Sequence, residues 1–156
     1  MKRYSHITKS EIDPSKLLES VRDRSAGGIA IFVGTVRDRN EGRAVSGLTY
    51  ETYRKMAERK MLEIERAAAS KFPVKRIASV HRYGTLSVGD VSVVVAVSCE
   101  HRADAFSACM FVIDEIKRLV PLWKKEALAD GKERWVEGGW QKTSDASMPK
   151  RSLGEA

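Results

Sequence analysis

The sequence has few cysteines and no long apolar run. Its two cysteines, Cys99 and Cys109, are too few for a secreted disulfide scaffold and lack the C-x-x-C spacing of a structural zinc site. The longest apolar stretch, from Val91 to Cys99, is far shorter than the roughly 20 residues that cross a bilayer. No apolar run follows Met1-Lys2-Arg3, so the secretory pattern is missing. We therefore expect a cytoplasmic protein that does not enter a membrane.

Common cofactor motifs are missing as well. The three histidines, His6, His81 and His101, do not have the spacing of metal ligands, and Gly27-Gly28 belongs to no phosphate-binding glycine loop. The sequence therefore predicts neither a metal nor a nucleotide cofactor. Aromatic residues are only 7 % of the chain and fall mostly at core-like positions. This composition disfavours a basic module that binds nucleic acid without catalysis, which we retain as the alternative function.

Positive charge is abundant. Lys and Arg number 28 against 21 Asp and Glu, which gives the 156-residue chain a net charge of +7. Apolar residues make up 42 % and charged residues 31 %, as in ordinary globular proteins. We predict one domain over residues 1–138 and a flexible tail over residues 139–156, which lack periodicity. The charge indicates an anionic partner, and the positions of the basic residues must show which kind of anion it is.

Hydropathy patterns and breakers predict an α+β domain with a mixed, largely antiparallel sheet. The helices are expected at 14–22, 54–71 and 101–120, with a short helix resuming from Pro121, and the strands at 29–33, 48–53, 76–83, 90–99 and 134–136. The run Ile29 to Val33 is continuously apolar, which predicts a central strand buried on both faces.

Two basic sites follow strands. Arg37 lies shortly after the apolar run, where a rigid strand would fix its guanidinium to bind a phosphate through two hydrogen bonds, whereas Arg39 and Arg43 are expected to be solvated. His101-Arg102 begins a helix, where free amides and the helix dipole favour an anion. For His101, an anion-binding role and a plain exposed helix start are equally well supported.

Two lysines and a cysteine complete the candidates. Lys117 ends the helical row Phe106, Met110, Ile113, and partial desolvation there would lower its pKa, although a lysine that snorkels from the core edge is the commoner case. Lys124 would share that face if the helix continued past Pro121. Cys99 next to His101 could be a nucleophile, but it shares the face of the alternating valines, which favours a buried, inert thiol.

Five segments resemble one family, the large catalytic subunit of molybdopterin synthase. They are Ile31 to Asp38 (IFVGTVRD), Val80 to Gly84 (VHRYG), His101-Arg102, Lys117 together with Pro121 to Glu126 (PLWKKE), and Arg134 to Glu137 (RWVE). The resemblance extends over almost all of residues 1–138.

The resemblance implies an α/β-hammerhead type of fold and a homodimer that binds a small ubiquitin-like sulfur carrier with a C-terminal Gly-Gly. The thiocarboxylate of the carrier would give sulfur to cyclic pyranopterin monophosphate, and two transfers would build the dithiolene of molybdopterin. Residues that match the family's binding site are Thr35, Val36, Arg37, His101, Arg102, Lys117, Lys124, Lys125 and Glu126. Lys117 and Lys124 would be catalytic. Gly138-Gly139 stands where some relatives have a basic side chain.

Overall fold

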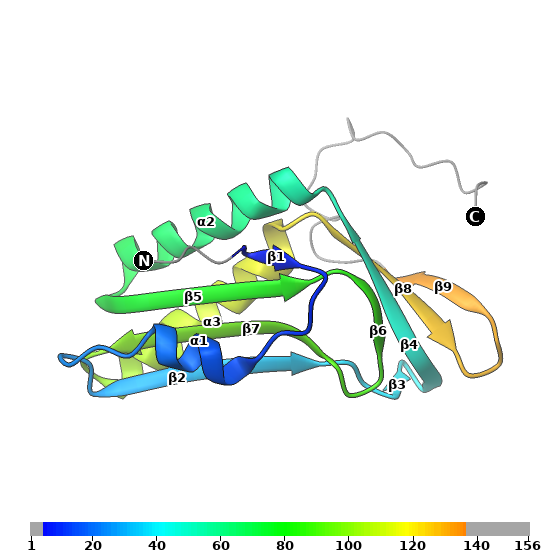
Figure 1. Cartoon of the computed structure of the whole chain (residues 1–156), viewed down its shortest axis with the longest axis horizontal. Helices are drawn as coiled ribbons and strands as arrows, with labels where there is room; N and C mark the ends of the chain where they lie inside the picture. Colours follow the sequence, from blue (N-terminus) through cyan, green and yellow to red (C-terminus); the bar gives the residue numbers. More distant parts are fainter. Residues whose placement is uncertain (1–4, 137–156) are drawn as a thin grey trace.

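The computed structural model describes residues 5–136, so the predicted tail at 139–156 lies outside the described residues. The described residues form two sheets and three helices, arranged as in Figure 1. Along the chain these elements are β1 (Ile7–Thr8), α1 (Pro14–Ser20), β2 (Gly28–Thr35), β3 (Arg39–Asn40), β4 (Arg43–Thr52), α2 (Arg54–Lys71), β5 (Val74–Arg82), β6 (Gly84–Ser87), β7 (Val91–Cys99), α3 (Arg102–Leu119), β8 (Leu122–Leu128) and β9 (Glu133–Val136).

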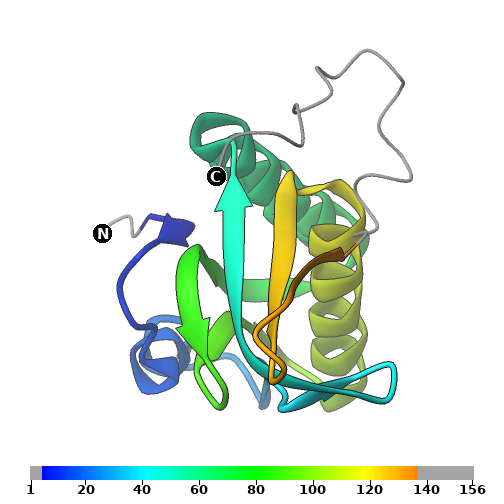
Figure 2. The same ribbon diagram turned by 90° about the vertical axis from the view of Figure 1, so that its right-hand side faces the viewer.

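The sheets are largely antiparallel, as the sequence predicts: the first is mixed, and all the described pairs of the second are antiparallel. One has the strand order β1-β5-β7-β2, and only its β1–β5 pair is parallel. The other has the order β3-β4-β8-β9, with β6 also paired to β4. Figure 2 shows the long strands β4 and β8 of this second sheet side by side, with α3 beyond them.

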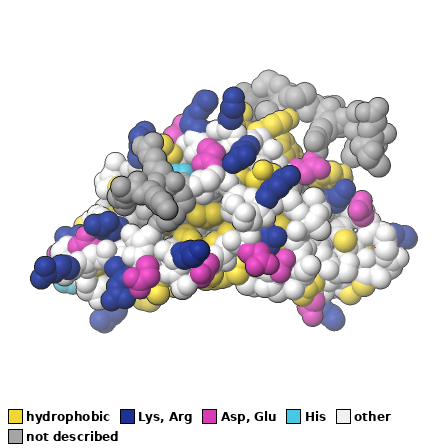
Figure 3. Space-filling model, in the orientation of Figure 1, with side chains coloured by type: hydrophobic (Ala, Val, Ile, Leu, Met, Phe, Trp, Pro, Cys, Tyr) yellow, Lys and Arg dark blue, Asp and Glu magenta, His cyan; other side chains and the backbone are white. Residues whose placement is uncertain are grey.

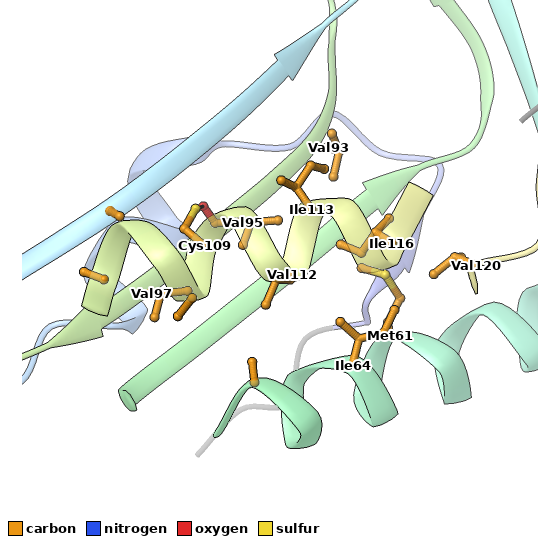
Figure 4. Packing of buried hydrophobic residues seen from close by; sticks show 14 of the residues in the cluster. Met61, Ile64, Val93, Val95, Val97, Cys109, Val112, Ile113, Ile116 and Val120 are labelled. Atoms are coloured by element: carbon orange, nitrogen blue, oxygen red, sulfur yellow. Dashed lines mark hydrogen bonds between the residues drawn. The ribbon is translucent and has the colours of Figure 1, made fainter. Parts of the chain in front are cut away.

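Strand β7 organises the core because its residues alternate between two helical layers. Val93, Val95 and Val97 pack in one cluster with α2 and α3 (Figure 4), whereas Val94 and Ala96 pack with α1 on the other face. All five are at most 5 % exposed. Burying one valine fully is worth roughly 1.5–3 kcal/mol relative to leaving it in water, so this strand anchors the domain.

Local signals explain where the helices lie. The Asp13 carboxylate accepts a hydrogen bond of 3.0 Å from the Ser15 amide, and Pro14 occupies the first turn, so α1 begins there. Helix α2 buries Ala57, Met61, Ile64 and Ala68 on one face, which is the predicted stripe. None of the described helices is long and apolar enough to cross a bilayer.

The segment after Pro121 is a strand, so the predicted short helix is wrong. Residues Leu122 to Leu128 form β8, which pairs with β4 from Thr52↔Leu122 to Val45↔Leu128 and with β9 on its other side. Pairing on both sides satisfies the backbone groups of β8 and overrides the helix propensity of its Lys, Glu and Ala residues.

The strand at 29–33 is also placed differently from its prediction. Strand β2 is at the edge of its sheet and, among the described strands, pairs only with β7. Ile29, Ile31, Phe32 and Val33 are therefore 37–40 % exposed. An apolar run identifies a strand with two apolar faces, but it does not show whether those faces are buried or exposed within one chain.

Candidate active site

A cavity of about 670 Å³ lies where the two sheets meet the C-terminal end of α3. The last residues of β2, the start of the following loop, the last turns of α3 and one face of β8 form its walls. Of the predicted site residues, the cavity brings together Thr35, Val36, Arg37, Lys117, Lys124 and Glu126. Arg39, which we expected to be solvated, lines it too. Four cationic side chains from three separate parts of the chain thus face one space.

Alternation along β8 separates two adjacent lysines. Lys124 and Glu126 line the cavity, and Lys125 does not. The Lys125 Nζ lies 3.3 Å from Glu133 Oε2 and 5.4 Å from the centre of the Trp135 ring. Successive side chains of a strand point to opposite faces. The structure therefore does not place Lys125 at the cavity, unlike the prediction.

Glu126 is a buried carboxylate with two donors. It is 2 % exposed, and its Oε1 accepts hydrogen bonds from Arg134 Nη2 at 2.8 Å and from Asn40 Nδ2 at 3.0 Å. Burial alone would raise the pKa of Glu126, but the bonds from Asn40 and Arg134 outweigh it and lower that pKa. Glu126 is therefore a fixed negative charge in a cavity that otherwise carries cations.

Lys124 is a cavity lysine whose pKa the surroundings lower. Burial lowers its pKa from the usual 10.5; Glu126 opposes this change, and the nearby cations Lys117 and Arg37 add to it. A lysine with a lowered pKa releases its proton more readily near neutral pH, as a proton-transfer group requires.

Lys117 lies at the cavity with an exposed side chain. The desolvation that we predicted for Lys117 is thus found at Lys124 instead. Phe106 and Met110, which precede Lys117 on the same helical row, are 66 % and 65 % exposed, while Ile113 is buried at 8 %. The predicted apolar stripe therefore runs over the surface before it enters the core.

His101 and Arg102 lie at the opposite end of α3 from the cavity. Arg102 begins the helix and Lys117 is in its last turn, which separates them by about 22 Å along the axis. Both side chains are exposed, and His101 Nε2 is 3.7 Å from a carboxylate oxygen of Glu100. Gly27 lets β2 approach this turn, because a Cβ there would be 2.3 Å from the Glu100 carbonyl oxygen. Within one chain these two residues do not join the other cations.

His81 lines the cavity, although sequence reasoning gave it no role there. Its Nδ1 lies 2.7 Å from the carbonyl oxygen of Arg82, and its ring meets Tyr50 edge-on at 4.9 Å. Burial, together with the charge of Lys117, lowers the pKa of His81 to about 4, against the opposing effect of the Arg82 bond. The sequence signal at His81 is its place in the family-like segment Val80 to Gly84, and that segment does not by itself show that a cavity forms there.

The thiols are unsuited to nucleophilic catalysis. Cys99 and Cys109 are both free and buried. Burial raises the pKa of Cys99 and raises that of Cys109 to about 11. The buried thiol that we favoured for Cys99 is confirmed, which argues against a cysteine-dependent transferase.

Comparisons with known proteins show which family the chain belongs to. A family model described as "MoaE protein" matches residues 7–119. A molybdopterin synthase catalytic subunit from Oryza sativa subsp. indica is 49 % identical over 126 residues, which are 81 % of this chain and 65 % of that protein. The Pyrococcus abyssi protein of the same name is 46 % identical over 76 % of this chain and 79 % of its own length.

Structural similarity agrees with the sequence matches. The crystal structure of molybdopterin synthase from Staphylococcus aureus superposes with a TM-score of 0.81 and 34 % identity, covering 88 % of this chain and 99 % of that chain. The fold and the cavity define an α+β protein with a cavity lined by several cationic side chains. The chain belongs to the MoaE family, and the predicted fold class is confirmed. Its match spans slightly less than two thirds of the length of the rice protein.

On the face drawn in Figure 3, the distribution of charge does not support the nucleic-acid alternative. In the view of Figure 3, Lys and Arg side chains are scattered among acidic and apolar ones and do not gather into a continuous basic surface. A protein that follows a nucleic-acid backbone needs such a surface. Arg37, Arg39, Lys117 and Lys124 do line one cavity, which suits a small anion.

Proposed function

We propose that this protein is the catalytic subunit of a molybdopterin synthase, a sulfurtransferase of molybdenum cofactor biosynthesis. It would move sulfur from the C-terminal thiocarboxylate of a small carrier protein to cyclic pyranopterin monophosphate. The observation that carries the proposal is that Arg37, Lys117 and Lys124 meet in one cavity. Family membership names the reaction, and the cavity supplies groups that suit its two anionic reactants.

The cations have different tasks in this proposal. Arg37 binds the substrate phosphate, because a planar guanidinium donates two parallel hydrogen bonds to phosphate oxygens. Thr35 and Val36 form the wall next to it. Lys117 binds the thiocarboxylate, since its exposed side chain can follow an incoming terminus. Lys124, with its lowered pKa, transfers protons as sulfur adds to the pterin, and the negative charge of Glu126 keeps that pKa from falling further.

The sulfur source is the partner protein, so no enzyme thiol takes part. In each transfer a carbon–sulfur bond forms on the pterin as a carbon–oxygen bond at that carbon breaks and its oxygen group leaves. Water then cleaves the carbon–sulfur bond to the carrier, which returns the carrier terminus to a carboxylate and leaves the sulfur on the pterin. The curated relatives are named as catalytic subunits, which fits a second, carrier subunit. A ubiquitin-like carrier with a C-terminal Gly-Gly is the proposed partner. The cytoplasmic location stays a prediction and agrees with two unpaired cysteines.

The proposal includes a homodimer. An apolar surface surrounds the free edge of β2, and we name it the β2 edge patch. Its members are Ile29, Ile31, Phe32, Val33, Phe106 and Met110. Phe32 has the same parity as Ala30, which packs in the α3 cluster, so Phe32 is on the face of the sheet that α3 covers, and Phe106 and Met110 belong to that helix. Exposed apolar side chains on a free strand edge fit a second copy of the chain.

A second copy also accounts for His101 and Arg102. The β2 edge patch adjoins the cavity, because Phe32 and Val33 belong to both. It also extends along α3 toward Arg102, since Phe106 lies one turn beyond that residue. A partner that packs antiparallel on this patch would bring its own helix start to the cavity. Its His101 and Arg102 would then add to the phosphate site.

The proposal is tested by mixing the purified protein with a thiocarboxylated carrier and cyclic pyranopterin monophosphate, and by measuring the dithiolene product. We expect product from the wild type and a loss of at least a hundredfold in Lys124→Ala, because a general acid–base group contributes about 10²–10⁴ in rate. Lys125→Ala is the matched control, since Lys125 faces away, and it should keep wild-type activity. A wild type without product, or equal losses in the two variants, would contradict the proposal.

A further inference from the structure

His81 is the residue of the cavity whose chemistry the proposed roles leave unused. It is 6 % exposed and lies on β5 near the end of the strand, with Tyr50 of β4 packed against its ring. The Arg82 carbonyl oxygen can only accept a hydrogen bond, so the proton of the neutral ring must be on Nδ1. The other nitrogen, Nε2, therefore carries a lone pair. Within residues 5–136 the ring makes no second hydrogen bond.

The side chain stays neutral in the pH range where an enzyme works. Burial and the charge of Lys117 lower its pKa to about 4, so at pH 7 almost every copy is unprotonated. Such a weak base is a poor proton acceptor at that pH, which excludes His81 as the general base. It is nevertheless a permanent hydrogen-bond acceptor.

The other side chains of the cavity offer few neutral hydrogen-bond acceptors. Arg37, Lys117 and Lys124 only donate hydrogen bonds. The hydroxyls of Tyr50 and Ser92 bond to each other, and Ser92 Oγ also donates to the Gly34 carbonyl oxygen at 3.2 Å. The Glu126 carboxylate accepts, but its charge repels an anionic guest. Thr35 and Asn40 also line the cavity, but the Thr35 hydroxyl can donate as well as accept, and Asn40 Oδ1 already accepts a bond from Arg37 Nη2 at 3.4 Å. Among the described lining side chains, His81 thus offers a neutral ring nitrogen, Nε2, that carries no proton and can only accept.

We propose that His81 binds an N–H group of the pterin ring system through its Nε2 and thereby selects a nitrogen heterocycle over a plain phosphate. This inference rests on the proposed function. A fused pterin carries ring N–H and amino donors, and each donor that leaves water needs an acceptor. The cations bind the phosphate end of the substrate, while His81 recognises the ring end without adding negative charge.

Two substitutions separate the two nitrogens of His81. His81→Asn places an amide N–H near the position of Nδ1, so the bond to the Arg82 carbonyl can persist while the acceptor at Nε2 is lost. His81→Gln places an amide oxygen near the position of Nε2. Calorimetry with the full chain should give a Kd for cyclic pyranopterin monophosphate about tenfold higher in His81→Asn and within about threefold of wild type in His81→Gln. Inorganic phosphate, used as the second probe, should bind equally to all three proteins.

A measurement on the unaltered protein guards against misfolded variants. The ¹⁵N resonance of His81 Nε2 should move when the pterin is added and stay in place with inorganic phosphate alone. An unchanged Kd in His81→Asn, an equal loss of phosphate and pterin binding, or a fixed resonance would each overturn the role of His81. A wild type that fails to bind the pterin would instead overturn the proposed function, and this inference with it.

Discussion

His6 lies between two carboxylates of α2 and fastens the N-terminal strand. Its Nδ1 is 3.3 Å from Glu58 Oε2, and its Nε2 is 3.2 Å from Glu65 Oε1. Glu58 also accepts a 3.0 Å bond from the Ile7 amide at the start of β1. The bond to Glu65 raises the pKa of His6 above its usual 6.5; burial opposes this, and both carboxylates add to it. The imidazolium is thus more stable in the folded chain than in the unfolded chain.

The sign of the pH effect follows from that raised pKa. The stabilisation by His6 is fully present below pH 6.5 and is lost as the pH rises through the folded-state pKa. We expect His6→Ala to lower the free energy of unfolding by roughly 1 kcal/mol at pH 6 and by clearly less at pH 9. Urea denaturation at both pH values measures this, with the exposed His101→Ala as control. An equal loss of unfolding free energy at both pH values would show that the charged cluster does not cause the stabilisation.

Cys99 tests whether the enzyme supplies the nucleophile. Its side chain is fully buried in the cluster with α2 and α3. We expect Cys99→Ala to cost about 1 kcal/mol of stability through lost packing. Sulfur transfer at 25 °C should stay within a few-fold of wild type. If a folded Cys99→Ala variant lost nearly all sulfur transfer, the cysteine-dependent mechanism would be favoured instead.

The hairpin of β8 and β9 keeps the acidic group of the cavity in place. Arg134 lies opposite Glu126 in the pairing of these strands and also reaches Glu41 Oε2 at 3.4 Å. Glu126 is almost completely buried, so removing Arg134 would leave a buried charge without its ion pair.

We therefore expect Arg134→Met to lower the free energy of unfolding by about 3 kcal/mol, the usual cost of breaking a buried ion pair from one side. Lys132→Met, in the exposed turn before β9, is the control and should change stability little. Chemical denaturation of the two variants measures the difference. If both variants unfold at the same denaturant concentration, the pair is not a structural anchor.

The sequence predicted the long elements well and the second sheet poorly. Helix α2 has the predicted bounds because a full apolar face repeats along it, and β7 was found from its alternating valines. The two-residue strands β1 and β3 and the four-residue β6 are too short to show a period. Strand β8 was missed because Lys124 to Ala127 are good helix formers, and only the pairing with β4 makes them a strand.

The same error limited the prediction of the site. Helical spacing put Lys117 and Lys124 on one face, and the structure does bring both to the cavity, although through a helix and a strand. Lys125 was expected at the site only from the family resemblance, and strand alternation puts it on the other face of β8. His81 and Arg39 needed the tertiary structure, because nothing near them in sequence shows that a cavity forms there.

At the scale of the whole molecule, the β2 edge patch is the feature that one chain does not explain. Its outermost members, Phe106 and Met110, are about two thirds exposed, and a row of apolar side chains continues along the edge of β2 that pairs with no other described strand. We expect Phe106→Glu to convert a dimer into a monomer, because a carboxylate would have to be desolvated in the interface.

Sedimentation velocity at micromolar concentration measures this change. Val88→Glu is the matched control: Val88 is also an exposed apolar residue, at 41 %, but it lies in the turn between β6 and β7, outside the patch. The control should sediment as the wild type does. A wild type that is monomeric at this concentration would contradict the homodimer.

The placement of the cations at opposite ends of α3 has a kinetic consequence. If each cavity borrows a helix start from its neighbour, the specific activity of the enzyme falls on dilution as dimers separate. Cyclic pterin added at high concentration would then delay this loss, because a ligand that contacts both chains links their association to its own binding. A single chain that contained every required cation would work equally well at any dilution.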